Sequence, residues 1–156
     1  MPDQSLLTDE VRALIGAPVE MGAVKVTLRG VRRALDVYLG DHGGAQYAEG
    51  DVVPGYVIAA LDSESSAAPM PALMPQSLLI SNEWSFERPM RLGEQYSATH
   101  RIVDISERFG GKFGYSLDFR SEVEFRDADG TVVARSASTM TQYDASQAIR
   151  DSESER

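Results

Sequence analysis

The hydrophobic and polar positions of this chain change their period near its middle. In the first half, apolar residues recur at helical spacing in two short segments, 8–15 and 28–39. Thr8 and Thr27 stand at the start of these segments, where a side-chain oxygen can cap the first free N–H groups of a helix. A glycine directly follows each segment and ends the predicted helix.

Extended patterns dominate the second half. The clearest is 112–126, where apolar residues at every second position from Phe113 to Phe119 alternate with small or polar ones, as in an antiparallel strand with one buried face. The Asp129-Gly130 pair that follows supplies the positive φ angles of a hairpin turn. The segments predicted to be extended are 19–26, 77–86, 95–107, 112–126 and 131–143. Early helices followed by long strands predict an α+β fold with an antiparallel sheet covered on one face.

Turn-forming and polar residues separate these elements. Segment 40–55 is rich in Gly and Asp and is predicted to be a loop, and 54–61 is predicted to be a short helix with Pro54 near its start. Residues 62–75 alternate Ser, Ala, Pro and Met, which indicates a connection with little regular structure. The polar tail has too little apolar surface to pack. We therefore expect a flexible N-terminal segment over 1–7, one domain over 8–144 and a disordered tail over 145–156.

Charge and composition narrow the function classes. The formal net charge is −9 and the pI is about 4.7, which opposes binding to nucleic acid or to anionic membrane surfaces. The chain has no cysteine, which excludes disulfides and thiolate metal sites, and its two histidines lack helical HxxxH spacing, so we expect no metal site. No apolar run reaches the roughly 20 residues of a membrane span. No secretory signal is visible either, so we expect a cytoplasmic protein.

Three segments follow a recognisable pattern. Residues 8–20 and 26–41 contain an Ile-Gly stop, a strand and a helix that ends in Gly-Asp. Residues 52–61, VVPGYVIAAL, form a short segment around a proline. Residues 86–110 contain Arg-Pro, Gly-Glu and Arg-Ile-Val-Asp, before a long strand and an Asp-Gly turn. Together these segments resemble the MaoC-like dehydratase and hydratase family, in particular its N-terminal-type domain, over about residues 8–144.

The resemblance implies a single hot-dog domain, in which a curved antiparallel sheet wraps around a helix. It also implies reversible addition of water across an α,β-unsaturated acyl thioester. Hydratases of the family carry Asp-x-Asn-x-x-His after the second helix, and the Asp and His act as general acid and base on one water. Asp41 fits the Asp position, but Gly43 replaces the Asn and Gln46 replaces the His. Because Gln cannot transfer a proton near neutral pH, the usual mechanism lacks one of its groups.

The resemblance also implies the candidate site residues. Asp41 is the candidate catalytic residue at the motif position, and His42, four residues before the position of the motif His, is a candidate relocated base because His titrates near neutrality. They are also compatible with a turn after Gly40 and a solvated loop histidine. Backbone N–H groups at a helix start would polarise the thioester carbonyl. The candidate substrate-binding residues are Gln46, Tyr47, Pro54, Gly55 and Tyr56, although Tyr47 also suits a packed loop anchor.

Three further features have alternative interpretations. The Met and Pro residues of 70–75 form either an adaptable lid over an acyl chain or an irregular packing segment. Trp84, Phe86 and Tyr96 are expected to be core or interface aromatics. His100 lies among polar residues of a predicted strand and is expected at the surface.

These patterns lead to one functional hypothesis with open alternatives. We expect a component of an (R)-specific enoyl-thioester hydratase or 3-hydroxyacyl-thioester dehydratase, acting on acyl-CoA or an acyl carrier protein without a cofactor. The alternatives are a non-catalytic acyl-binding subunit of a heteromeric dehydratase and a repurposed hot-dog enzyme, such as a cyclase of secondary metabolism. Hot-dog domains of this family pair edge to edge, so we expect a homodimer or a heterodimer with a catalytic MaoC-like subunit.

Overall fold

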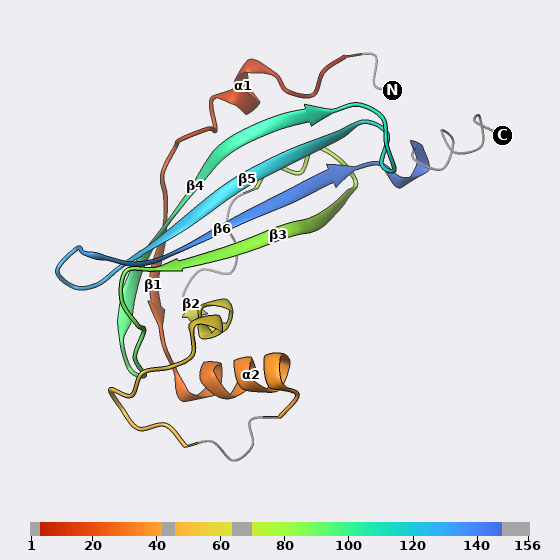
Figure 1. The fold of residues 1–156 in the computed structure, drawn as a ribbon. Helices are drawn as coiled ribbons and strands as arrows, with labels where there is room; N and C mark the ends of the chain where they lie inside the picture. The colour runs from red at the N-terminus through yellow and green to blue at the C-terminus, as the bar shows by residue number, and fades with distance from the viewer. Residues whose placement is uncertain (1–3, 42–45, 64–69, 148–156) are drawn as a thin grey trace.

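The computed structural model describes residues 4–41, 46–63 and 70–147 (Figure 1). They form a six-stranded antiparallel sheet with the strand order β2-β1-β4-β5-β6-β3. The elements are α1 (Asp9–Arg12), β1 (Val19–Lys25), α2 (Leu28–Leu39), η1 (Gly55–Ala60), β2 (Asp62–Ser63), β3 (Gln76–Phe86), β4 (Gln95–Arg108), β5 (Ser116–Arg126) and β6 (Val132–Tyr143). The sheet curls over α2, which confirms the predicted α+β hot-dog fold (Figure 1).

Helix α2 lies against the curled part of the sheet. Thr27 caps its start, and its Oγ1 accepts a hydrogen bond from the N–H of Gly30 at 3.0 Å. Gly40 follows the helix with φ 75°, a left-handed conformation that glycine adopts without strain. Val31 and Leu35 are buried on the side that faces the sheet. The helix predicted from the sequence is therefore confirmed at both ends.

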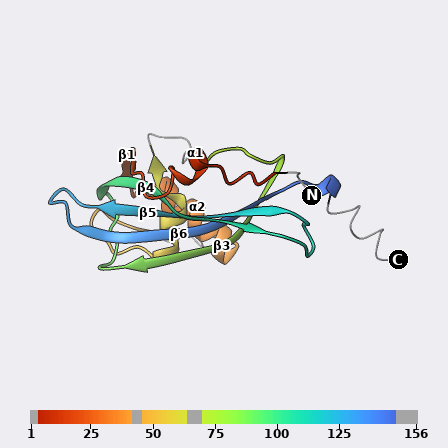
Figure 2. The same ribbon diagram turned by 90° about the horizontal axis from the view of Figure 1, so that it is seen from above.

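Two hydrophobic clusters follow each other along the long strands. The first lies under α2 and η1, and its members Val26, Val57 and Val133 are fully buried. The second lies under α1 and the N-terminal segment, and it contains Leu117 and Phe119 of β5. Full burial of one valine stabilises the fold by roughly 1.5–3 kcal/mol. Figure 2 shows the long strands β4, β5, β6 and β3 side by side, with β3 at the outer edge.

Strand β5 begins later than the alternation in the sequence predicts. The strand expected over 112–126 starts at Ser116, because the chain turns through Gly114, which has φ 62°. Phe119 faces the second hydrophobic cluster, as the pattern predicts. Asp118, on the opposite face, is also buried, and it lies in a hollow lined by Phe113 of the preceding turn and Ile80 of β3. Both faces at the start of β5 therefore carry buried residues.

His100 is buried, so its predicted surface position is wrong. Its exposed fraction is 2%. It points to the same face of β4 as Tyr96, Ala98 and Ile102, which all belong to the hydrophobic core. The polar residues beside it in the sequence occupy the other face of the strand, which made the segment look exposed.

Three shorter elements differ from the prediction in extent. The helix expected over 8–15 is reduced to α1, and the helix expected over 54–61 is the 3₁₀ helix η1. The first residues of the connection expected over 62–75 pair with β1 as β2. No helix in the described part of the chain is long and apolar enough to cross a membrane.

The outer boundaries of the domain stay predictions. Leu7, in the segment expected to be flexible, is buried in the second hydrophobic cluster. Of the tail expected to be disordered, residues 148–156 lie outside the described residues.

Candidate functional site

The predicted catalytic position directly follows α2. Asp41 comes after the Gly40 cap and is exposed. His42 and Gly43 lie outside the described residues. Gln46, where the described chain resumes, is exposed as well. Asp41 and Gln46 therefore lie at the surface on either side of the undescribed segment.

Three other predicted site residues, Pro54, Gly55 and Tyr56, form the start of η1. The carbonyl oxygen of Pro54 accepts a hydrogen bond from the N–H of Val57 at 3.0 Å. The N–H groups of Gly55 and Tyr56 precede this bond, at positions where a helix leaves its donors to other acceptors. Two adjacent backbone donors thus lie at the start of η1.

Gly55 lies against the ring of Phe86, the last residue of β3. A β-carbon on Gly55 would come within 3.1 Å of this ring, which is closer than ordinary van der Waals contact. The absence of a side chain at Gly55 therefore allows the start of η1 to pack directly on the edge strand.

Three aromatic side chains from three elements meet beside the end of α2. The rings of Tyr38 and Tyr56 stack with centroids 4.9 Å apart and planes 27° apart. Trp84 of β3 meets Tyr38 edge-on at 6.0 Å. Each such pair adds roughly 0.5–1.5 kcal/mol beyond the burial of its surface. This aromatic cluster (Tyr38, Tyr56 and Trp84) holds η1 beside the helix end that leads to Asp41.

Tyr38 was not singled out from the sequence. A signal was present, because Val37, Tyr38 and Leu39 are three consecutive apolar residues in an amphipathic helix. All three are exposed, with fractions of 71%, 48% and 65%. Exposed apolar residues gathered at one place indicate contact with a ligand or a partner.

Tyr47 and the segment 70–75 fit the packing alternatives of the sequence analysis. Tyr47 is half-buried and packs against the first hydrophobic cluster. In the segment 70–75, Met70 and Met74 pack against the second cluster, under the N-terminal segment. Gln142 fixes this segment, because its side chain accepts the N–H groups of Leu73 and Met74 at 2.9 and 3.2 Å. The Met and Pro residues therefore cover the opposite end of the core from α2.

Glu94 closes the turn before β4. Its carboxylate accepts hydrogen bonds from the N–H of Arg91 at 3.0 Å, the guanidinium of Arg88 at 3.0 Å and the hydroxyl of Tyr96. Burial alone would raise the pKa of Glu94, but these bonds outweigh it and hold the pKa below its usual value. Burial, together with the Glu94 bond, raises the pKa of Tyr96. In segment 86–110, Glu94 of the Gly-Glu pair therefore has a structural role.

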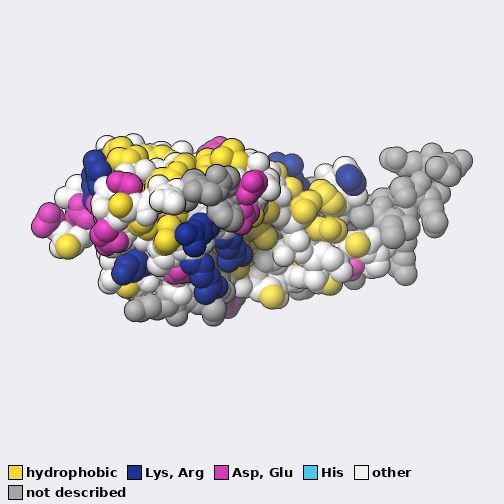
Figure 3. Space-filling view, turned by 90° about the horizontal axis from the view of Figure 1, so that it is seen from below, with side chains coloured by type: hydrophobic (Ala, Val, Ile, Leu, Met, Phe, Trp, Pro, Cys, Tyr) yellow, Lys and Arg dark blue, Asp and Glu magenta, His cyan; other side chains and the backbone are white. Residues whose placement is uncertain are grey.

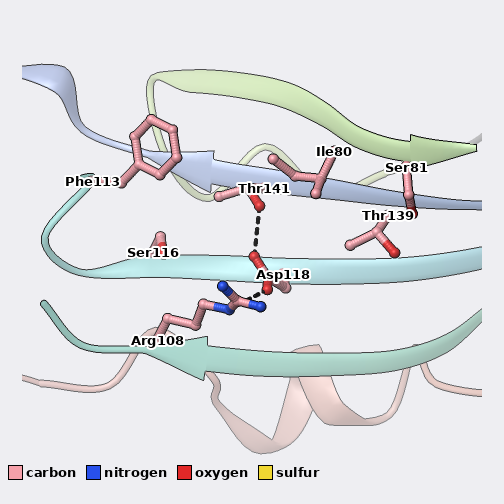
Figure 4. A pocket seen from close by; sticks show the side chains of 8 residues that line it. All are labelled: Ile80, Ser81, Arg108, Phe113, Ser116, Asp118, Thr139 and Thr141. Atoms are coloured by element: carbon pink, nitrogen blue, oxygen red, sulfur yellow. Dashed lines mark hydrogen bonds and ion pairs between the residues drawn. The ribbon is translucent and has the colours of Figure 1, made fainter. Parts of the chain in front are cut away.

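A hollow of about 250 Å³ lies on the other face of the sheet, near the start of β5 (Figure 4). At its centre, Asp118 accepts a hydrogen bond from the hydroxyl of Thr141 at 2.6 Å and pairs with Nε of Arg108 at 2.6 Å. Ile80 and Phe113 form part of its wall. Because both carboxylate oxygens are engaged, this hollow is a satisfied polar cluster and holds no free acid–base pair.

His100 contributes a buried polar group to the core. Its Nε2 atom has no hydrogen-bond partner among the described residues, and burial lowers the pKa of the imidazole. The ring is therefore neutral at neutral pH. Within residues 4–41, 46–63 and 70–147, no group of three or more His, Asp or Glu side chains could hold a metal ion.

Solved structures with a similar fold include a MaoC-like dehydratase and two heteromeric complexes. The ChsH1-ChsH2 complex from Mycobacterium tuberculosis matches with a TM-score of 0.65 and 13% sequence identity, over 88% of this chain and 98% of that chain. The HadBC complex of the same organism, a 3R-hydroxyacyl-ACP dehydratase, matches with a TM-score of 0.57 and 17% identity, over 87% and 99%. A MaoC-like dehydratase from Rhodospirillum rubrum matches with a TM-score of 0.55 and 16% identity, over 83% and 92%. No protein-family model and no curated protein matches the chain.

Proposed function

We propose, from the fold that this chain shares with MaoC-like dehydratases, that it is one subunit of an acyl-thioester dehydratase or hydratase. We propose further that a second hot-dog subunit supplies the acid–base histidine. The observation that supports a second subunit is Gln46, which occupies the position of the His in the hydratase motif. An amide side chain neither gives nor takes a proton near neutral pH, so it cannot replace an imidazole in moving a proton to or from water.

The role of this chain is then to bind the acyl thioester. The N–H groups of Gly55 and Tyr56 are the donors that would polarise the thioester carbonyl. The aromatic cluster lies beside these donors through Tyr56, and with the exposed Val37 and Leu39 at the end of α2 it supplies an apolar surface for the substrate. Asp41 lies at the end of the same helix, where it would orient the partner's catalytic group or the water.

The edge strand β3 supports pairing with a second subunit. It lies at the end of the sheet, so one side of its backbone has no neighbouring strand among the described residues. Its apolar residues Leu78, Leu79 and Ile80 have exposed fractions of 44%, 52% and 52%. A long apolar edge strand is a template for another strand, and natural proteins cover such edges. The two heteromeric complexes among the solved structures point the same way.

Size-exclusion chromatography with light scattering, followed by an enoyl-thioester hydration assay on the same peak, tests the proposal. The chain should be inactive alone and should become active with a hot-dog protein of the same genome that carries Asp-x-Asn-x-x-His. A homodimer that hydrates an enoyl-CoA alone, and loses this activity on Asp41→Asn, would overturn the proposal. In that case Asp41, with His42, would be catalytic in this chain.

A further inference from the structure

The outward face of α2 carries a group of arginines. Arg29, Arg32 and Arg33 are exposed, and their i, i+3 and i+4 spacing places them on one side of the helix. We call these three residues the arginine face. Figure 3, which views the molecule from the side where α2 lies, shows Lys and Arg gathered in a patch near the middle.

This arginine face differs from most arginines of the sheet and its turns, although Arg91 and Arg101 also have no ion pair with another described residue. The sheet and its turns carry arginines that pair with carboxylates, namely Arg88, Arg108, Arg120, Arg126 and Arg135. No ion pair between described residues includes a member of the arginine face. The only carboxylate within α2 is Asp36. A chain with a formal net charge of −9 therefore presents a local positive surface beside the candidate site.

We propose that the arginine face docks an acidic carrier protein, which presents the acyl group on its thioester arm. This inference rests on the proposed function and names the carrier that it left open. The net negative charge of this chain repels other anionic surfaces at long range, but screening limits that repulsion to about 8 Å at physiological salt. An acidic partner that approaches α2 therefore meets the arginines first, and the charges select both the partner and its orientation.

The form of the surface favours a protein over the nucleotide of coenzyme A. Nucleotides and other small ligands bind in concave sites, whereas the arginine face is the outward side of an exposed helix. Further along α2, the exposed residues are Asp36 and then the apolar Val37, Tyr38 and Leu39. A charged surface next to an apolar one is typical of protein–protein contacts.

The position of the arginine face also suits delivery to the site. Arg33 precedes Tyr38 by five residues, which at 1.5 Å per residue corresponds to about 8 Å along the helix. A carrier bound over the arginines would thus hold its arm close to the aromatic cluster and to the donors of η1. The arginine face of α2 would then bind the carrier protein, and the C-terminal end of the same helix would lie beside the acyl group.

Titration of the chain with a holo acyl carrier protein that bears no acyl group, followed by calorimetry, tests this inference. We expect the Arg32→Glu/Arg33→Glu variant to bind about tenfold or more weakly, and added salt to weaken the unsubstituted chain more than the variant. The matched control is Arg12→Glu/Arg101→Glu, which changes the charge equally on α1 and β4 and should bind within about twofold of the unsubstituted chain. Arg32→Gln/Arg33→Gln provides a milder second variant if the reversal lowers the melting temperature.

Two results would overturn the inference. One is carrier binding that is the same in the reversal variant as in the control. The other is loss of coenzyme A binding in the reversal variant while carrier binding is unchanged, because the arginines would then recognise the nucleotide. Carrier binding is measured without any reaction, so it is independent of the proposed function. If a complex hydrates enoyl-CoA but does not bind the carrier protein, only this inference is wrong. If the carrier protein binds through the arginines but no turnover occurs, only the proposed function is wrong.

Discussion

Gly30 of α2 lies so close to the carbonyl oxygen of Ala60 in η1 that a β-carbon on Gly30 would collide with it. The helix that leads to Asp41 and the helix that contains Tyr56 are therefore in direct backbone contact. Thr27, which caps α2, also donates its hydroxyl hydrogen to Asp62 just after η1. The relative position of these two helices, and so of the candidate site, depends on the absence of a side chain at position 30.

We expect Gly30→Ala to destabilise the fold by roughly 1–3 kcal/mol, because overpacking forces the backbone of η1 to move. In a helix without this contact the same change would stabilise by about 1 kcal/mol, so the sign of the effect is decisive. Urea unfolding followed by circular dichroism measures it. The control is Arg33→Ala on the exposed side of α2, which should change stability by no more than about 0.5 kcal/mol. A more stable Gly30→Ala variant would show that α2 and η1 are not in contact.

A second prediction concerns the stack of Tyr38 and Tyr56. Tyr56→Ala removes one ring of the pair and should raise KM for the acyl thioester about tenfold, with a smaller effect on kcat, since a tenfold change corresponds to about 1.4 kcal/mol of binding. Tyr56→Phe keeps the ring and should stay within about twofold of the unsubstituted protein. Steady-state kinetics of the complex with the catalytic subunit test both variants. Equal losses in the two variants would assign the effect to the hydroxyl group and not to stacking.

The sequence predicted the elements that local patterns specify. Helix α2 is specified by its caps, Thr27 and Gly40, and by an apolar stripe that includes Val31 and Leu35. Strands β4 and β6 agree with their predicted ranges to within one residue at each end. These features depend on residues a few positions apart, so a single sequence contains them.

The features that the sequence did not reveal depend on contacts between distant segments. His100 is buried because other segments cover its face of β4, and although Ala98 and Ile102 share that face, the polar type of His100 favoured a surface position. Tyr38 becomes a site residue only because η1 and β3 bring Tyr56 and Trp84 beside it. The late start of β5 follows from a glycine turn that the alternation of apolar residues conceals. The candidate site was therefore predicted in part, with its backbone donors but without its aromatic cluster.

A third prediction restores the hydratase motif. The double substitution Gly43→Asn/Gln46→His creates Asp-x-Asn-x-x-His from Asp41 onwards and so tests the proposal that Gln46 leaves the chain inactive alone. We expect this variant to hydrate an enoyl-thioester without a partner, since general acid–base catalysis typically contributes about 10²–10⁴-fold. The matched control adds Asp41→Asn and should return the rate to background. An inactive double variant with an intact fold would mean that the chain lacks more of the catalytic site than this one motif.

A fourth prediction concerns the edge of the sheet. Leu79→Lys places a charge on β3, and edge lysines oppose strand pairing. We expect the unsubstituted chain to form a dimer, either with itself or with its partner subunit. Under the same conditions the Leu79→Lys variant should elute as a monomer. Light scattering after size-exclusion chromatography measures the mass. Val103→Lys, at the irregular position of β4, changes an exposed apolar residue in the same way and should leave the dimer intact. Loss of the dimer in both variants would indicate a general effect of charge and not pairing through β3.

The last prediction concerns His100, whose buried imidazole has a lowered pKa because burial disfavours the charged form. As the pH falls through the ordinary value of about 6.5, the unfolded chain takes up a proton at this position, whereas the folded chain does so only at a lower pH. Stability is therefore complete above that pH and decreases below it, by at most about 1.4 kcal/mol per pH unit. His100→Leu removes both the titration and the unpartnered Nε2, so it should be at least as stable at about pH 7.5 and lose less between about pH 7.5 and 5.5. Urea unfolding at the two pH values tests this, with His42→Gln as the control that should keep the pH dependence. A parallel decline in the unsubstituted chain and in His100→Leu would assign the dependence to the carboxylates and not to the buried histidine.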